Sequence, residues 1–353
     1  MTTFQALGYI IRINRGSEKA ERDYFRFITY LTFFPKFFSG PVERSNRFLP
    51  QLTNLSGFKK ENLEDGVRLF LWGAFKKIVI AYNLYWPVNE VYSNIGAYSG
   101  WQLLLVYFVQ TLYIYMEFSG YTDMALGAAK VLGINLVDNF NRPFLARNIS
   151  EFWRRWHISL SSWCNDFIYS PFIVKYRKYE NFAILGGVFL TFFTIGIWHE
   201  ANWTFIALGL LQAIAIVYEY YTKKARLQIA SKYSKPLVNA VSRILVFLFV
   251  SLSMVFFFSH TISDSWYLLS NMFSSGKNGT EMLTFTSHGI EFFLAILAFI
   301  IIFVAEMITE KGKSVIKIFL EQPIWIKYSG YALLVLAILF AGSEWVPIEY
   351  MRF

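Results

Sequence analysis

The 353-residue chain is 55% hydrophobic and only 16% charged, whereas soluble domains carry roughly a quarter charged residues, so composition argues against a soluble protein. Aromatic residues at 20% suit a helical bundle with lipid outside and aromatic belts at both membrane surfaces. The net charge of +9 falls in short clusters between apolar runs, as in loops beside anionic lipids, which argues against a nucleic-acid partner. The single cysteine, Cys164, excludes an intramolecular disulfide and a cysteine-based metal site.

Apolar stretches long enough to cross a hydrocarbon core of about 30 Å, which takes roughly 20 helical residues, recur along the chain. The expected spans centre on Val67–Tyr85, Trp101–Phe118, Phe182–Trp198, Trp203–Tyr221, Val238–Phe258, Ile290–Ile308 and Tyr328–Phe340. The fold class predicted is all-α, a polytopic transmembrane helical bundle. No internal repeat or low-complexity linker divides the sequence, so we expect one domain over residues 1–353.

Two further apolar stretches, Phe27–Phe38 and Tyr121–Leu136, are too short or too broken for full spans and predict re-entrant segments. Pro35, Gly40 and Pro41 interrupt or follow the first of them. Irregular backbone is tolerated at membrane depth only where protein or a water-filled cavity surrounds it. A recess within the bundle is therefore expected here.

Polar and charged residues concentrate between Gly120 and Asn202. Each charge costs about 2.5 to 3.5 kcal/mol at the centre of a membrane helix, so such a block predicts a buried polar site. If Ser150–Asn165 is one helix with Ser150 as N-cap, then Arg154, His157, Ser161 and Asn165 share a face. That face could be an interfacial stripe whose arginines meet lipid phosphates. His157 lies in the middle of the stripe, which favours a site.

His199 follows a long apolar run and precedes Glu200. The pair resembles the start of the H-E-x-x-H zinc motif, but position 203 is Trp, so the second ligand is missing and no metal is expected. No serine lies in a G-x-S-x-G elbow. Two readings stay open: a hydrogen-bonded packing histidine, or a neutral imidazole that removes a proton from a hydroxyl.

A basic, acid-poor segment follows the fourth expected span and contains Lys223, Lys224, Arg226, Lys232 and Lys235. By the positive-inside rule this loop is predicted to be cytoplasmic. Other basic clusters, at Lys175–Lys178 and Lys311–Lys317, make the difference in basic residues between the two sides of the membrane smaller.

Several motifs resemble those of the membrane-bound O-acyltransferase family, in particular its alginate O-acetyltransferase branch, with teichoic-acid D-alanyltransferases as the nearest sister group. They are F-F-P-K-F-F-S-G-P-V-E-R at Phe33–Arg44, F-S-G-Y-T-D-M-A at Phe118–Ala125, N-F-N-R-P-F at Asn139–Phe144, F-W-R-R-W-H-I-S-L-S at Phe152–Ser161, N-D-F-I-Y-S-P at Asn165–Pro171 and G-I-W-H at Gly196–His199. The motif-rich core is residues 31–211, whereas the C-terminal helices, 238–353, match mainly in hydropathy.

The resemblance implies a ring of transmembrane helices with a central tunnel and re-entrant segments, in the bacterial cytoplasmic membrane. It implies transfer of an acetyl or other acyl group from a thioester such as acetyl-CoA, with no tightly bound cofactor, to a hydroxyl of an envelope polysaccharide or exopolysaccharide. An extracytoplasmic, esterase-like acetyltransferase is the implied protein partner. The family's near-invariant histidine falls on His199 and its second conserved position on His157. Asp123, Asn139, Arg154, Arg155 and Asp166 also match motif positions and are candidates for binding donor or acceptor.

The sequence departs from the family pattern at three places. Glu200 stands where most members of the branch have glycine, so a carboxylate either orients His199 or faces solvent. Pro171 is followed by Phe172 and a basic run instead of a Gly-Gly turn, which suggests a different substrate rim. The chain also opens inside what resembles an early family segment, so the usual first helices are expected to be absent.

Two other classes remain as alternatives. A transporter or channel would also place histidine, aspartate and arginine within the membrane. An inactive scaffold would only recruit envelope-modifying enzymes.

Overall fold

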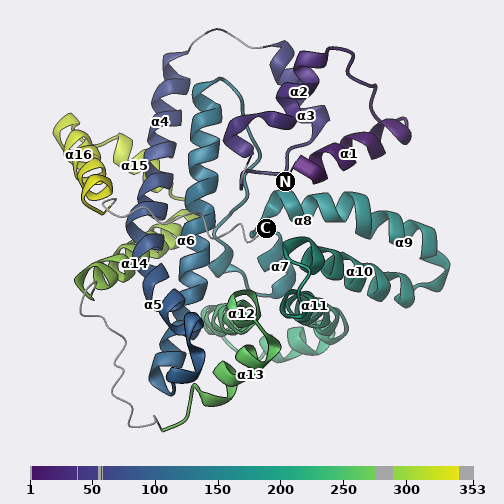
Figure 1. The fold of residues 1–353 in the computed structure, drawn as a ribbon, viewed down its shortest axis with the longest axis vertical. Helices are drawn as coiled ribbons and strands as arrows, with labels where there is room; N and C mark the ends of the chain where they lie inside the picture. The colour runs from purple at the N-terminus through teal and green to yellow at the C-terminus, as the bar shows by residue number, and fades with distance from the viewer. Residues whose placement is uncertain (1, 38, 55–56, 58, 276–288, 342–353) are drawn as a thin grey trace.

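Lipid offers no hydrogen-bonding partner to the backbone, so membrane-spanning segments satisfy their own amides as helices. The computed structural model describes residues 2–37, 39–54, 57, 59–275 and 289–341, and this part of the chain contains helices and no strand. The N-terminal elements are α1 (Thr2–Asn14), α2 (Tyr24–Thr32), the 3₁₀ turn η1 (Phe34–Lys36) and α3 (Ser45–Thr53). They lie together in the upper right of Figure 1. The all-α fold predicted from the composition is confirmed.

The centre of the molecule is the 31-residue helix α6 (Trp101–Val131), flanked by α4 (Lys60–Ala74), the π-helical segment η2 (Phe75–Ala81) and α5 (Tyr82–Ser93). Shorter helices follow: α7 (Ile149–Trp153), α8 (Ile158–Cys164), the π-helical η5 (Asn165–Tyr169) and α9 (Ser170–Tyr176). The long helices α10 (Asn181–His199), α11 (Trp203–Ala230) and α12 (Lys235–Phe258) come next, then α13 (Ile262–Asn271), α14 (Gly289–Glu310), α15 (Val315–Leu320) and α16 (Ile324–Ala341). Figure 1 shows α15 and α16 on the opposite side of α6 from α8–α10.

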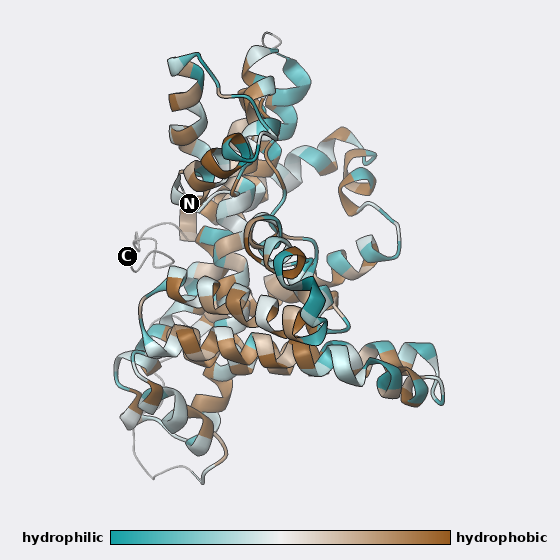
Figure 2. Cartoon of the chain, turned by 90° about the vertical axis from the view of Figure 1, so that its right-hand side faces the viewer, coloured by the Kyte–Doolittle hydropathy of each residue, from teal (hydrophilic) through white to brown (hydrophobic). Residues whose placement is uncertain are grey.

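Six helices of the described residues are long and apolar enough to cross a membrane: α6, α10, α11, α12, α14 and α16. They coincide with six of the expected spans, so the chain is a multi-pass membrane protein. The other expected span, Val67–Tyr85, lies in the continuous helical run formed by α4, η2 and α5 and is not among the six. Figure 2 shows hydrophobic residues along much of the length of the helices and hydrophilic residues mostly at turns and helix ends.

The re-entrant segment expected at Tyr121–Leu136 is wrong, because α6 continues without interruption to Val131. Paired glycines bring this part of α6 into close contact with α4. A Cβ on Gly73 would lie 2.5 Å from the Gly120 carbonyl oxygen, and one on Gly127 would lie 2.6 Å from the Gly66 carbonyl oxygen. The α4 and α6 backbones therefore touch, as small residues permit between membrane helices.

The loop expected at Lys223–Lys235 is also largely helical, since α11 runs to Ala230 and α12 begins at Lys235. Only residues 231–234 connect the two helices. The basic side chains therefore extend the end of a span instead of forming a free loop.

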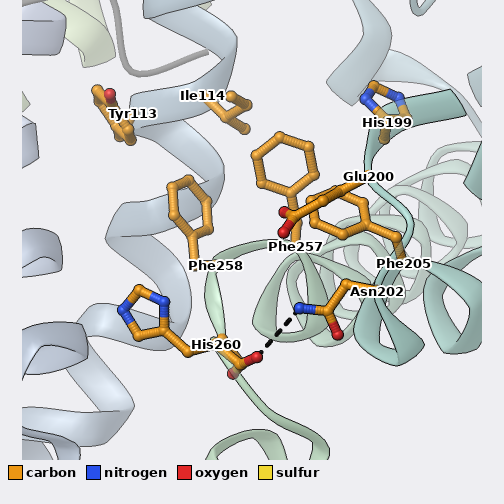
Figure 3. Close-up of a pocket in the computed structure, with 10 residues that line it drawn as sticks. Tyr113, Ile114, His199, Glu200, Asn202, Phe205, Phe257, Phe258 and His260 are labelled. Atoms are coloured by element: carbon orange, nitrogen blue, oxygen red, sulfur yellow. Dashed lines mark hydrogen bonds between the residues drawn. The ribbon is translucent and has the colours of Figure 1, made fainter. Parts of the chain in front are cut away.

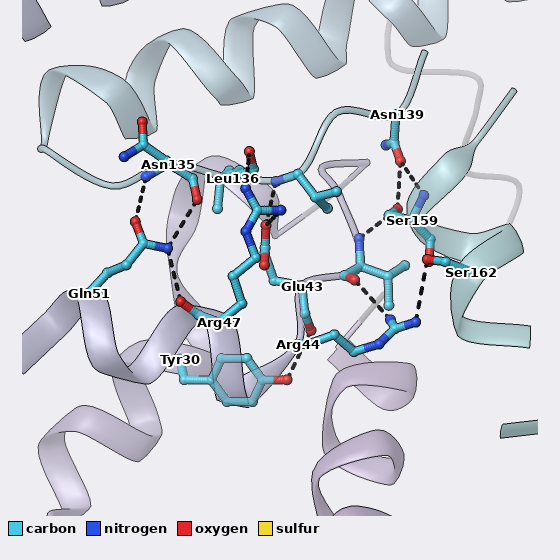
Figure 4. Close-up of polar contacts among 12 residues, drawn as sticks. Tyr30, Glu43, Arg44, Arg47, Gln51, Asn135, Leu136, Asn139, Ser159 and Ser162 are labelled. Atoms are coloured by element: carbon cyan, nitrogen blue, oxygen red, sulfur yellow. Dashed lines mark hydrogen bonds and ion pairs between the residues drawn. The ribbon is translucent and has the colours of Figure 1, made fainter. Parts of the chain in front are cut away.

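The irregular backbone expected around Pro35 and Pro41 is present and is enclosed by protein. Residues 39–43 are buried without helical structure. Polar contacts fasten this stretch to the segment after α6 (Figure 4): the Tyr30 hydroxyl donates to the Glu43 carbonyl over 3.0 Å, and the Glu43 carboxylate accepts from the Val137 amide. Residue 38 of the expected segment lies outside the described residues.

Candidate functional site

His157 lies at a break between two short helices, not in the middle of one. The single helix predicted for Ser150–Asn165 is wrong: α7 ends at Trp153 and α8 starts at Ile158. The N-cap of α7 is Asn148 rather than Ser150, and its side chain accepts from the Glu151 amide over 2.7 Å. His157 adopts a left-handed conformation, with φ 43° and ψ 51°, which costs a non-glycine residue of order 1–3 kcal/mol and is characteristic of functional sites.

The left-handed turn at His157 is held by a clamp of hydrogen bonds from the Asn139 segment (Figure 4). The Asn139 side-chain oxygen accepts from the Ser159 hydroxyl over 2.5 Å, and its carbonyl oxygen accepts from the Ile158 amide over 3.0 Å. The Ser159 hydroxyl in turn accepts from the Val42 amide over 2.9 Å. Three motifs distant in sequence thus meet at one point, and Asn139 acts through the backbone of this turn.

The His157 imidazole is 1% exposed, and neither ring nitrogen has a hydrogen-bond partner among the described residues. Its ring centroid lies 4.7 Å from that of Phe118 and 6.5 Å from that of Trp198. Burial, and to a smaller degree the nearby His199, lower the pKa of His157 well below its ordinary value, so the ring is neutral. Buried unpaired nitrogens cost about 1–3 kcal/mol each, which a polar ligand group would recover.

His199 is the last residue of α10 and lies where two small cavities adjoin. The outer cavity, of about 70 Å³, is lined by His199, Glu200, Asn202, Ser259 and His260 together with aromatic side chains. The inner cavity, of about 40 Å³, is walled by residues such as Trp153, Phe192 and Leu208. His199, Ile114 and Phe257 border both cavities, so the imidazole lies on the path between them.

A third, larger cavity of about 890 Å³ opens between α10, α11 and α12. Its wall includes Val188 and Ile216, each one helical turn from residues of the inner cavity, Phe192 and Gln212. The three cavities therefore follow one another along the α10–α11 pair. The large cavity is basic, with Arg147, Arg154, Lys223 and Arg226 in its lining.

Glu200 borders the outer cavity, and in Figure 3 its carboxylate points across the pocket while the His199 ring lies at one side. Asn202 donates to the His260 carbonyl oxygen over 3.2 Å and caps α11 by accepting from the Thr204 amide. The sequence interpretation missed His260. It lies 61 residues from His199 in the sequence, and the antiparallel packing of α11 and α12 brings the two to one pocket.

The other candidates are distributed differently from the prediction. Arg154 is exposed and lines the large basic cavity, whereas Arg155 points elsewhere and pairs with Glu310 over 2.7 Å and with Glu151 over 2.8 Å. The predicted face shared by Arg154 and His157 does not exist, because the break at residue 157 separates them.

Two of the acidic candidates form ion pairs. Asp123 pairs with Lys76 over 2.5 Å, at the contact between α6 and η2. Asp166 pairs with Arg44 over 3.0 Å. Neither carboxylate lines the cavities beside His199, so the structure favours a structural part for both.

Two polar residues that the sequence interpretation missed support the site. Gln212 borders the inner cavity, accepting from the Trp153 indole over 3.1 Å and donating to the Ser253 hydroxyl over 2.8 Å. The Glu219 carboxylate accepts from the Ile149 amide over 2.5 Å and the Ser150 amide over 3.0 Å. The available signal was the presence of Gln212 and Glu219 within the mostly apolar stretch Trp203–Tyr221.

The described residues contain no cluster of three or more His, Cys, Asp or Glu side chains able to hold a metal ion.

Comparison with known proteins gives a family match and several similar proteins. The sequence model of the membrane-bound O-acyltransferase family, MBOAT, matches residues 16–259. The chain is 32% identical to a probable alginate O-acetylase of Azotobacter vinelandii over 77% of its own length and 52% of that protein. It is 31% identical to a peptidoglycan O-acetyltransferase of Helicobacter pylori over 74% of the chain and 49% of that protein.

A teichoic acid D-alanyltransferase of Bacillus subtilis is 30% identical over 63% of the chain and 58% of that protein. The chain thus spans about half the length of the alginate and peptidoglycan relatives it matches.

Proposed function

Because the chain belongs to the membrane-bound O-acyltransferase family, in the branch that includes alginate O-acetylases, we propose that it transfers an acetyl group from a thioester to a hydroxyl of an envelope polymer. The relatives are bacterial, and the six apolar helices make the chain a multi-pass protein of the cytoplasmic membrane. The observation that carries the proposal is the position of His199, between an apolar inner cavity and a polar outer one.

In the proposed reaction, His199 removes the proton from the acceptor hydroxyl as its oxygen attacks the thioester carbonyl. The acyl carbon–sulfur bond breaks, the carbon–oxygen ester bond forms, and the proton passes from the imidazole to the departing thiolate. No net proton, electron or co-reactant is required. The small volume of the inner cavity limits the water beside the thioester, and water would otherwise hydrolyse it.

The large basic cavity supports entry of the donor from its side. Arg154 and Lys223 line it and have exposed side chains, and cations of this kind attract the phosphates of a donor such as acetyl-CoA. The apolar wall formed by Val188 and Ile216 leads from these cations toward the inner cavity. The acyl arm would follow this wall to His199.

We assign His157 to positioning and not to proton removal. Its ring is buried beside Phe118 and Trp198 and is absent from the linings of both cavities that His199 borders. A neutral imidazole with two unpaired nitrogens is suited to receive a hydrogen bond from donor or acceptor when the site fills. Its strained backbone fixes the direction in which it does so.

The acceptor in this proposal is a polysaccharide hydroxyl, reached through an extracytoplasmic, esterase-like partner protein. Among the described residues, the helix connections that line the outer cavity are residues 200–202 and 259–261, which are too short to hold a polymer chain. We therefore expect a soluble envelope protein to co-purify with this one. Full acetylation of the polymer by this chain alone would contradict the partner.

The test of the proposed function measures thiol release from acetyl-CoA in membrane vesicles of the producing cells. The unmodified protein should release CoA, and His199→Ala should slow release by about 10²- to 10⁴-fold, the usual size of a general-base contribution. Expression and monodispersity of the variant should be normal, since His199 is at a helix end beside a cavity. A transporter or an inactive scaffold would release no CoA, and undiminished release by His199→Ala would leave the histidine a packing residue.

A further inference from the structure

The inner cavity beside His199 is closed in by bulky apolar side chains. It is bordered by Phe152, Phe192, Leu208 and Met254, each of them less than 10% exposed. The amide of Gln212, which also borders it, is already bonded at both ends, to Trp153 and to Ser253. A space with such walls favours a small apolar group over water.

The volume of this cavity corresponds to very few atoms. One water-sized occupant needs roughly 10–15 Å³ by this measure, so the 40 Å³ beside His199 holds about three or four non-hydrogen atoms. An acetyl group, with two carbons and one oxygen, fits such a space, whereas a butyryl group adds two methylenes. Resting on the function proposed above, we propose that the inner cavity is the acyl pocket and that Leu208 and Met254 limit the transferred group to acetyl.

The two helices that wall the cavity, α10 and α11, pack backbone against backbone beside it. A Cβ on Gly209 would lie 2.4 Å from the Phe192 carbonyl oxygen, and one on Gly196 would lie 2.5 Å from the Phe205 carbonyl oxygen. The backbones of α10 and α11 are therefore in direct contact on both sides of the cavity. Its size is set by the side chains that project into it, from α11 at Leu208 and from α12 at Met254.

The location agrees with the direction of donor entry. The large basic cavity meets the inner one within a helical turn, at Val188 and Phe192 on α10 and at Ile216 and Gln212 on α11. A thioester arriving along this path brings its acyl group into the inner cavity first. Its carbonyl then faces His199, and the acceptor hydroxyl approaches from the outer cavity.

The experiment compares acetyl-, propionyl- and butyryl-CoA as donors in membrane vesicles, with thiol release as the readout. One extra methylene in an apolar pocket changes the rate by roughly 10- to 200-fold, so the unmodified protein should prefer acetyl-CoA to propionyl-CoA by at least tenfold. Leu208→Ala removes three carbons from the wall and should lower that ratio about tenfold or more. Met254→Ala enlarges the same pocket from the α12 side, so the ratio can still be measured if Leu208→Ala does not fold.

The matched control is Leu84→Ala, since Leu84 is fully buried on α5 and borders neither cavity beside His199. It should keep the acetyl preference unchanged even if it lowers stability. Unchanged donor ratios in both Leu208→Ala and Met254→Ala, with acetyl transfer intact, would overturn the acyl pocket alone. No release from acetyl-CoA by the unmodified protein would instead overturn the proposed function.

Discussion

At the scale of single residues, the site depends on a turn that no isolated helix would form. His157 is held at a positive φ because Asn139 accepts hydrogen bonds from Ile158 and Ser159, the two residues that follow it. The Ser159 hydroxyl also accepts from the Val42 amide. The irregular segment after η1 therefore supports the orientation of His157 although it contributes no side chain to the cavities.

We predict that Ser159→Ala destabilises the protein by about 1–3 kcal/mol, because it leaves the buried Val42 amide without its acceptor. Thermal unfolding of the detergent-solubilised protein measures this loss. Ser162→Ala is the matched control, because Ser162 is exposed and its hydroxyl only accepts from Arg44 over 3.4 Å, a contact that water can replace. Equal stability of the two variants would contradict the clamp.

The two histidines should respond differently to substitution. His157→Asn keeps a hydrogen-bonding side chain, so its acetyl transfer should fall less than that of His199→Ala, which removes the proposed base. The measurement is CoA release at saturating acetyl-CoA, with expression and monodispersity checked. Greater loss in His157→Asn than in His199→Ala would reverse the two roles.

At the scale of elements, the contact between α4 and α6 lets charges lie inside the bundle. The paired glycines bring η2 against α6, where Lys76 meets Asp123 and Lys77 meets Glu117. A buried charge is tolerated when an opposite charge lies in contact with it, whereas removal of one partner is strongly destabilising. The polar block of the sequence is thus partly a structural ion-pair network and partly a site.

Gly73→Ala should destabilise the α4–α6 contact by about 1–3 kcal/mol, the usual cost of forcing a methyl group into a packed interior. The new Cβ would lie 2.5 Å from the Gly120 carbonyl oxygen and 2.6 Å from the Met124 amide nitrogen, and backbone atoms cannot yield as side chains do. Gly96→Ala is the control, because nothing lies within 4 Å of a Cβ there. Thermal unfolding of both variants decides the matter, and a neutral Gly73→Ala would refute the close approach.

At the scale of the whole molecule, the two ends of the α10–α12 helices differ in charge: the end with the α11–α12 turn is basic, and the end with the α10–α11 turn is not. Lys223, Lys224 and Arg226 lie near the α11–α12 turn. The connections beside the outer cavity, residues 200–202 and 259–261, contain no lysine or arginine. The positive-inside rule then puts the basic cavity toward the cytoplasm, where thioester donors are made, and the outer cavity toward the envelope.

A cysteine placed at Ser231, in the exposed α11–α12 turn, should react with a membrane-impermeant thiol reagent only after the cells are opened. The native Cys164 is buried and should not contribute. A cysteine at His260, which is exposed beside the outer cavity, should show the opposite pattern. Efficient labelling of Ser231→Cys in intact cells would invert the orientation.

The sequence by itself determined that lipid surrounds this protein and where most of its spans lie, and it selected His157 and His199 as candidate site residues. Hydropathy summed over about twenty residues is enough to specify a lipid-embedded helix, because the backbone has no other way to satisfy its amides there. The family motifs carried the two histidines, since each lies within one continuous stretch of residues.

Only the tertiary structure decided which polar residues meet. Periodicity predicted one helix through His157, but the hydrogen bonds that break it come from Asn139, in a separate segment. Arg155 is paired by Glu310 from a helix far along the chain, while Arg154 lines the basic cavity. The cavities on either side of His199 likewise exist only where α10, α11 and α12 pack together, because an enclosed space is a property of surfaces brought together and not of any one segment.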